Sequence, residues 1–162
     1  KLRRAVITRL GTGASENPKH DPPPARPAME RAGIAKSEHL DDVLDVLRDY
    51  RIQSADKSSG IVELEIALCL SQRFGRKNVK SQQNIRRGRI DIEVFDVGVE
   101  IKTPTSVGEL QRMIGQVHGY QKTYGPNLAV IIVSDVVPEK DIREYAADLE
   151  ERGICVISPA DP

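Results

Sequence analysis

Residues 89–102 read RIDIEVFDVGVEIK, two short runs in which aliphatic and charged side chains alternate. Alternation with a period of two is typical of β-strands, so the stretch predicts a hairpin whose aliphatic side chains share one face. Asp91 and Glu93 share the other face of the first strand, and Glu100 and Lys102 share a face of the second. These charged faces can be the same side of the sheet. A half-exposed hairpin gives the same alternation with its charges in water, so the neighbouring residues must decide between a site and a solvated face.

The sequence around the hairpin predicts a mixed α/β domain. A tight turn at Asp96–Gly98 joins the two hairpin strands. In chain order, the expected elements are a helix over 58–75, strands over 78–85, 89–95 and 97–103, a helix over 107–124, a strand over 128–134, a helix over 138–152 and a strand over 154–158. The fold class is therefore α/β, with a central mixed five-stranded sheet flanked by helices and a parallel final β-α-β unit.

The chain ahead of this domain has a different composition. Residues 11–27 contain five prolines and favour an extended linker. Residues 37–50 place apolar side chains at helical spacing, with Ser37 in the N-cap position, and this amphipathic helix either packs on its own domain or binds a partner. We expect an N-terminal arm over 1–57, as a candidate oligomerisation element, and a catalytic domain over 58–162.

Charge is balanced over the whole chain but not locally. The 162 residues include 24 Lys plus Arg and 24 Asp plus Glu, so net charge does not favour nucleic acid. The segment 73–89 has no acidic residue and seven basic ones: Arg73, Arg76, Lys77, Lys80, Arg86, Arg87 and Arg89. This basic segment ends at the hairpin, where it either contacts phosphates or forms a solvated run of charge.

The cysteines and the length of the apolar runs indicate the cellular compartment of the protein. Cys69 and Cys155 lie in apolar runs without the spacing of metal ligands, which indicates reduced core thiols rather than a zinc site or a disulfide. No apolar run approaches the roughly 18–20 residues that span a bilayer. We expect a soluble cytoplasmic protein with no membrane partner and no nucleotide cofactor.

Polar residues also stand in unusual places on the helices that flank the hairpin. Glu63 lies at the head of an apolar stripe on the preceding helix, and a carboxylate there needs a partner because burying it alone is unfavourable. Gln116 and Tyr120 form an i, i+4 pair on the following helix, with Arg112 one turn earlier on the same face. His118 falls on another face and is expected to be a surface residue.

These residues together resemble the PD-(D/E)xK nuclease superfamily, which has the restriction-endonuclease-like fold. Four elements carry the resemblance, namely the helical Glu63, Gly88-Arg-Ile-Asp91 opening a strand, Glu100-Ile101-Lys102 on the next strand, and Gln116-x-x-x-Tyr120 on the helix after it. The last element is similar to that of RecB-type members. Ile90 stands where the proline of the family name would be. The resemblance spans about 60–158 and implies the core order α-β-β-β-α-β-α-β.

The resemblance also implies roles for these residues. Oxygen atoms of Asp91, Glu100 and the backbone carbonyl of Ile101 would hold Mg²⁺ or Mn²⁺. Glu63 would orient metal-bound water or be a ligand of a second metal ion. Lys102 would hold or help to activate the attacking water, and Gln116 and Tyr120 would line the site and position the nucleic-acid strand. Glu93 has no role in the family pattern and is expected to be peripheral.

The expected function is therefore divalent-metal-dependent hydrolysis of phosphodiester bonds in DNA, by an endonuclease of restriction, repair or junction-resolving type. Predicted phosphate contacts come from Arg86, Arg87, Arg89, Lys80, Lys77 and Arg112. Cutting both strands of a duplex favours a homodimer. The alternative is a nuclease-fold protein that binds nucleic acid or a protein partner without cutting, and a third hypothesis is an α/β domain with a solvated hairpin.

Overall fold

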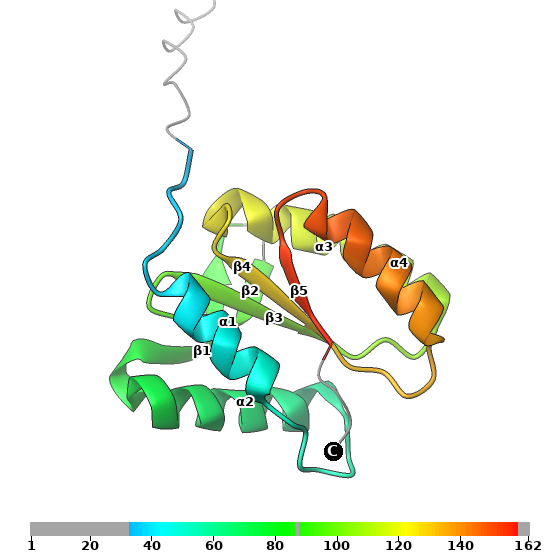
Figure 1. Ribbon diagram of the computed structural model, residues 1–162, viewed down its shortest axis with the longest axis horizontal. Coiled ribbons are helices and arrows are strands. Elements are labelled where there is room, and N and C mark those ends of the chain that lie inside the picture. The colour runs from blue at the N-terminus through cyan, green and yellow to red at the C-terminus, as the bar shows by residue number, and fades with distance from the viewer. Residues whose placement is uncertain (1–32, 87, 159–162) are drawn as a thin grey trace, which may run out of the picture. The chain divides into compact units, whose positions relative to one another are not determined.

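The computed structural model describes residues 33–86 and 88–158 of the chain (Figure 1). The chain divides into two units, 1–32 and 33–162. The first unit, with the predicted linker 11–27, lies outside the described residues.

Five strands and four helices, with one short 3-10 helix η1, form the described part of the chain. Their bounds are α1 Leu40–Asp49, α2 Ser59–Phe74, η1 Arg76–Asn78, β1 Val79–Ile85, β2 Gly88–Val94, β3 Val97–Lys102, α3 Val107–Tyr124, β4 Leu128–Ile132, α4 Glu139–Glu150 and β5 Cys155–Ile157. The strands make one sheet in the order β1-β2-β3-β4-β5. β1, β2 and β3 are antiparallel, whereas β3, β4 and β5 are parallel. The predicted α/β fold with a mixed five-stranded sheet is confirmed.

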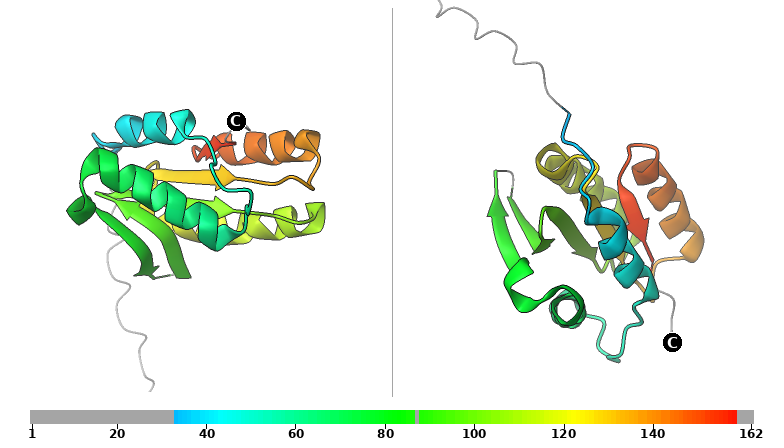
Figure 2. Two further views of the ribbon diagram at one scale, coloured as in Figure 1. Left: turned by 90° about the horizontal axis from the view of Figure 1, so that it is seen from below. Right: turned by 60° about the vertical axis from the view of Figure 1, so that its left-hand side comes forward.

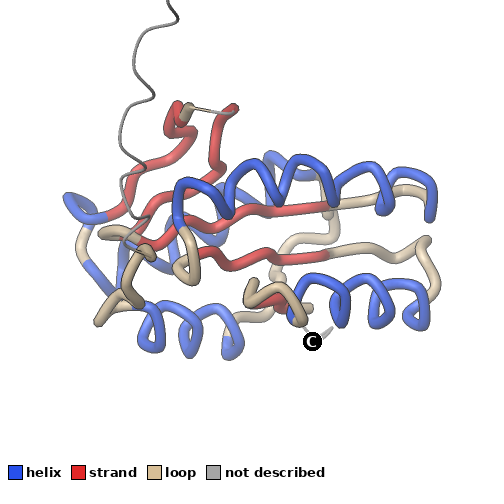
Figure 3. Tube along the Cα trace, turned by 90° about the horizontal axis from the view of Figure 1, so that it is seen from above, coloured by secondary structure: helices blue, strands red, loops and turns tan. Residues whose placement is uncertain are grey.

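Helices cover both faces of the sheet, so the domain has two apolar cores. α1 and α2 pack on one face, and α3 and α4 pack on the other (Figure 1). Every residue of β4 is buried, because successive side chains of this strand enter the two cores in turn. Figure 3 shows the β1–β2 hairpin extending beyond the rest of the sheet.

α1 belongs to the first core, where its apolar stripe packs on the domain. The buried side chains of α1 are Leu40, Val43, Leu44 and Leu47. The predicted N-cap is wrong, because the cap is His39 and not Ser37. The Ser37 hydroxyl instead accepts the His39 N–H at 3.1 Å and donates to Asp96. A role of residues 1–57 as an oligomerisation arm stays a prediction.

The hairpin turn lies one residue earlier than expected. Phe95 and Asp96 form the turn, and Phe95 adopts a positive φ of 54°. The Phe95 ring stacks on His39 with 3.9 Å between ring centroids. Gly98, predicted to be part of the turn, lies inside β3.

Two tyrosines of α3 dock against two glycines of the sheet. A Cβ on Gly88 would lie 3.2 Å from the Tyr120 ring, and a Cβ on Gly98 would lie 2.7 Å from the Tyr124 ring. The Tyr124 hydroxyl donates to Glu93 at 2.8 Å. Glu93, expected to be peripheral, thus fixes α3 on the sheet.

The other expectations from composition have mixed outcomes. Cys69 and Cys155 are free thiols, as predicted, but both are only half-buried. Within residues 33–86 and 88–158, no helix is long and apolar enough to cross a membrane.

Candidate active site

The pairing of β2 with β3 ends at Asp91. Ile92 pairs with Val99, but the ladder does not continue to Asp91 and Glu100 within these described strands. The Asp91 Oδ2 atom instead accepts the N–H of Ile101 at 2.8 Å. The Asp91 carboxylate therefore lies between the two strands at the point where they part.

The same separation breaks the side-chain alternation of β2. Ile92 packs in the first core, with α1 and α2, whereas Ile90 packs in the second core, with α3 and α4. The expectation that the aliphatic residues of this strand share one face is wrong for Ile90. The right-hand view of Figure 2 shows β1 and β2 standing away from the remaining strands.

A cavity of about 510 Å³ opens where the strands part, and we call it the junction cavity. It receives side chains from helices on both faces of the sheet. The six predicted catalytic residues all line it, namely Glu63 from α2, Asp91 from β2, Glu100 and Lys102 from β3, and Gln116 and Tyr120 from α3. Ile101, the predicted backbone ligand, lines it as well. The structure thus brings together residues that are up to 57 positions apart in the chain.

A chain of hydrogen bonds crosses the junction cavity from β3 to α3. The Lys102 ammonium donates to Glu100 Oε1 and, at 2.7 Å, to Gln116 Oε1. The Gln116 amide then donates to the Tyr120 hydroxyl at 2.6 Å. Only 9% of the Lys102 side chain and 3% of the Glu100 side chain are exposed. The ammonium is therefore held in one position rather than free in solvent.

Glu100 has the most perturbed environment in the junction cavity. Burial raises the pKa of its carboxyl to about 7, while the Lys102 charge opposes this rise and the Asp91 charge adds to it. Its Oε2 atom is buried without a hydrogen-bond partner among the described residues. A buried carboxylate oxygen with no partner calls for an explanation, and a bound cation supplies one.

Gln82 is a residue of the junction cavity that sequence reasoning missed. The Glu63 carboxylate, expected to need a partner, accepts a hydrogen bond of 2.5 Å from the Gln82 amide nitrogen. The same nitrogen lies 3.4 Å from Asp91 Oδ1. Gln82 comes from β1, directly across from Asp91 in the register of the hairpin. The position of Gln82 opposite Asp91 is the feature from which its place in the cavity could have been predicted. A glutamine in a polar strand does not by itself indicate a functional site.

The oxygen atoms that line the junction cavity are suitable ligands for a hard cation such as Mg²⁺. In the part of the chain that the structure describes, no group of three or more His, Cys, Asp or Glu side chains is arranged to hold a metal. Four carboxylates, those of Glu63, Asp91, Glu100 and Glu109, nevertheless line the cavity. Buried oxygen atoms of Glu100 and Gln82 lack partners among the described residues. Carboxylate and amide oxygens are the ligands that Mg²⁺ and Mn²⁺ favour.

The predicted phosphate-binding residues lie on the surface of the domain. Five of them are described and exposed: Lys77, Lys80, Arg86, Arg89 and Arg112. Arg87 lies outside the described residues. Arg89 lines the junction cavity, whereas Arg112 does not. Lys80 lies 3.1 Å from Glu93, so part of its charge is offset. Contact of these residues with nucleic acid stays a prediction.

His118 differs from its expected place on the surface. Its side chain is half-buried, and its Nε2 atom is buried without a hydrogen-bond partner among the described residues. His118 does not line the junction cavity, so it has no part in the chain of hydrogen bonds there.

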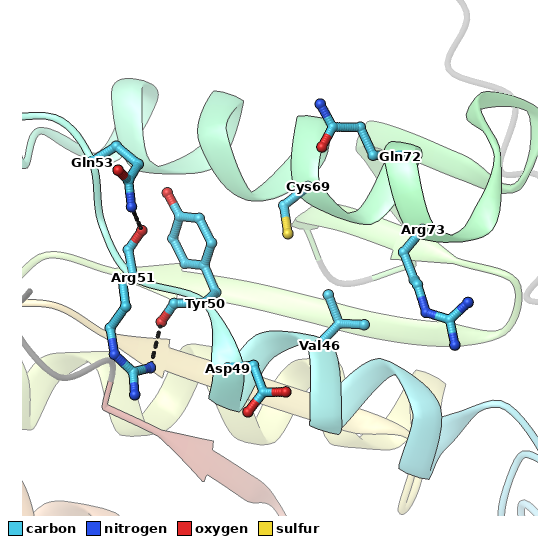
Figure 4. Close-up of a pocket in the computed structure, with 8 residues that line it drawn as sticks. All are labelled: Val46, Asp49, Tyr50, Arg51, Gln53, Cys69, Gln72 and Arg73. Carbon is cyan, nitrogen blue, oxygen red and sulfur yellow. Dashed lines mark hydrogen bonds between the residues drawn. The ribbon is translucent and has the colours of Figure 1, made fainter.

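A second cavity, of about 660 Å³, lies between α1 and α2 (Figure 4). Tyr50, Cys69 and Arg73 are among its lining residues, and Arg51 donates a hydrogen bond of 3.0 Å to the Tyr50 backbone oxygen. It is larger than the junction cavity but contains a single carboxylate, that of Asp49. Of these two cavities, the junction cavity is therefore the one that contains the predicted set of acidic residues.

Comparisons with known proteins give distant structural likenesses. No family model and no curated protein matches the chain. A repair endonuclease from Pyrococcus abyssi is similar with 18% identity and a TM-score of 0.37, over 67% of this chain and 50% of its own. A complex of EndoMS with double-stranded DNA has 15% identity and a TM-score of 0.40, and the match covers 70% of this chain and 49% of that one. A restriction endonuclease with substrate DNA has 22% identity and a TM-score of 0.29, and the match covers 58% of this chain and 48% of that one. The chain spans about half the length of each of these structures.

Proposed function

We propose that this protein is a divalent-metal-dependent endonuclease that hydrolyses phosphodiester bonds in DNA. The observation that supports the proposal is the convergence of the charged side chains of Glu63, Asp91, Glu100 and Lys102 in the junction cavity. Their side chains come from β2, β3 and the helix α2. Such a set is unusual for a structural pocket, because charged groups are rarely buried together without a ligand.

The proposed cation site uses the oxygen atoms of the cavity wall. Asp91 and Glu100 would hold Mg²⁺ or Mn²⁺ with the backbone carbonyl of Ile101, and Glu63 would add a carboxylate from α2. When bound, a divalent cation supplies a Lewis acid that polarises the scissile phosphate and makes water more acidic. The partnerless Glu100 oxygen is the atom that most directly supports this assignment.

The chain's own side chains then arrange the reactants. Lys102, fixed by Glu100 and Gln116, offers its ammonium to the attacking water and to the phosphate oxygens. The water releases a proton to solvent as its oxygen bonds to phosphorus, the bond from phosphorus to the leaving sugar oxygen breaks, and that oxygen takes a proton from solvent. Tyr120 holds Gln116 in place and so keeps the ammonium directed at the site.

The exposed basic residues supply the proposed contacts with DNA. Arg89 lies in the wall of the junction cavity, and Arg86, three residues earlier in the chain, is exposed. Phosphate contacts by these guanidinium groups bring the backbone of DNA to the carboxylates. Cutting both strands of a duplex needs two active sites, so we propose that the protein acts as a homodimer.

One experiment tests the proposed function. The protein is incubated with plasmid, branched and single-stranded DNA in Mg²⁺ or Mn²⁺, beside Asp91→Ala, Lys102→Ala and the exposed control Lys140→Ala on α4. We expect cleavage by the wild-type protein and the control, and a loss of about 100-fold or more in the two cavity variants. Cleavage that survives both cavity substitutions contradicts the assigned site. Salt-sensitive binding of DNA without any cleavage supports the non-catalytic alternative instead.

A further inference from the structure

Gln82 has a strained backbone in the middle of a strand. Its φ angle is 54°, in the left-handed region that a residue with a Cβ rarely adopts. Ser81 pairs with Ile92 and Gln83 pairs with Ile90 on either side, but Gln82 does not pair with Asp91 within this described ladder. The strand continues in the same register, so Gln82 is no inserted residue. Such strain persists only where the surroundings determine it, and it concentrates at functional sites.

The strained backbone places the Gln82 side chain between two carboxylates. Its amide nitrogen donates to Glu63 of α2 at 2.5 Å and lies 3.4 Å from Asp91 of β2. The carbonyl oxygen of the same amide is buried without a partner among the described residues. A side chain that served only to fill space in β1 would have no reason to bury an amide oxygen unpaired, because that costs free energy.

We infer that Gln82 is a positioning residue of the cation site, an inference that rests on the proposed function. Its amide nitrogen holds Glu63 toward Asp91, and its amide oxygen adds one more oxygen atom beside the cation or its water. The oxygen ligands proposed above do not complete an octahedral shell by themselves, so a further oxygen atom or water is needed. Among the described residues of the cavity, Gln82 and Glu100 carry the buried oxygen atoms without partners.

The test measures binding of Mn²⁺ alone, without DNA, by electron paramagnetic resonance of the free ion. Gln82→Met keeps the length of the side chain and removes both polar atoms. Gln82→Gly removes the side chain and relieves the left-handed backbone, so this variant is not threatened by misfolding. Gln83→Met is the matched control, because Gln83 is the next residue of β1 and donates to the Ser81 backbone oxygen rather than to the cavity carboxylates.

We expect both Gln82 variants to bind Mn²⁺ about 10- to 100-fold more weakly than the wild-type protein, as for other residues that orient metal ligands. The control should bind within about twofold of the wild-type protein. Gln82→Gly should melt no lower than Gln82→Met, which separates the loss of affinity from loss of folding. Binding of Mn²⁺ by both folded Gln82 variants with wild-type affinity overturns the inference.

A second readout follows the amide itself. Addition of diamagnetic Mg²⁺ should shift the Gln82 side-chain NH₂ resonances of ¹⁵N-labelled protein, which are assigned as the pair that Gln82→Met lacks. Resonances that do not move at saturating Mg²⁺ overturn the inference.

The role of Gln82 and the proposed function can fail separately. If the wild-type protein cleaves DNA but the Gln82 variants bind Mn²⁺ normally, the role of Gln82 is refuted and the proposed function stands. Tight Mn²⁺ binding that depends on Gln82, without cleavage, would refute the function and keep the role.

Discussion

At the scale of single residues, Glu100 and Lys102 are a buried ion pair two positions apart on one strand. Both side chains have lost most of their hydration, so each depends on the other and on Gln116. Removing one partner from such a pair costs more free energy than removing both, because the remaining charge is left buried and alone.

Glu100→Gln should therefore lower the free energy of unfolding by about 3–5 kcal/mol, because the Lys102 ammonium then lacks its counter-charge. The double variant Glu100→Gln/Lys102→Met should recover part of that loss. Urea denaturation monitored by circular dichroism measures both. A double variant as unstable as Glu100→Gln alone would contradict the ion-pair account.

Sequence reasoning found the catalytic candidates but not their partners. Asp91, Glu100 and Lys102 stand out because charged residues interrupt aliphatic strands, and Glu63 stands out on an apolar stripe. Gln82 was missed because its significance comes from a strained φ and a cross-strand position, neither of which has a signature in the local sequence. Glu93 has no role in the family pattern, and its contact with Tyr124, 31 residues away, has no signature in the local sequence.

At the scale of secondary-structure elements, the position of α3 decides where Gln116 meets Lys102. The Tyr120 and Tyr124 rings occupy the space where Cβ atoms on Gly88 and Gly98 would lie. Because these contacts are one helical turn apart, they fix both the height of α3 over the sheet and its rotation.

Gly98→Ala should lower the free energy of unfolding by about 1–3 kcal/mol, because its Cβ would lie 2.7 Å from the Tyr124 ring in a packed core. The matched control is Gly115→Ala in α3, whose Cβ would meet nothing within 4 Å. This control should raise stability by roughly 0.5–1 kcal/mol, since alanine favours the helix over glycine. Urea midpoints of the two variants should thus move in opposite directions, and a shared direction would contradict the docking account.

The elements themselves were largely predictable from the sequence. α3 has the predicted bounds, 107 to 124, because apolar periodicity, Ser106 as N-cap and Gly125 as C-cap agree there. The start of α1 and the hairpin turn were misplaced by one to three residues. In both cases a tertiary contact, Ser37 with Asp96 and His39 with Phe95, overrides the local preference.

At the scale of the whole molecule, a cation that binds only the folded state links metal binding to stability. Mg²⁺ at about 100 times its dissociation constant should raise the free energy of unfolding by about 2.7 kcal/mol. Differential scanning calorimetry in MgCl₂, against NaCl of equal ionic strength, measures the rise in Tm. Asp91→Asn should show no such rise, and an equal rise in that variant would place the cation elsewhere.

The exposed basic residues predict a salt-dependent affinity for DNA. Log K for a short duplex should fall linearly with log salt, and Arg86→Gln should reduce the slope by about 1 if Arg86 contacts one phosphate. Fluorescence anisotropy across a salt series measures the slope. Arg143→Gln on α4, where Arg143 already pairs with Glu139, is the control and should leave the slope unchanged. An unchanged slope for Arg86→Gln would remove that residue from the interface.

The two glycine–tyrosine contacts also restrict how this protein can diverge. A side chain at position 98 is tolerated only if the ring at position 124 is lost or moves, whereas Gly88 is restricted first by its own φ of 137°. Drift at position 98 therefore has to be accompanied by change at position 124. Homologues that keep the chemistry of the junction cavity should show this pairwise covariation even where the surrounding sequence has become unrecognisable.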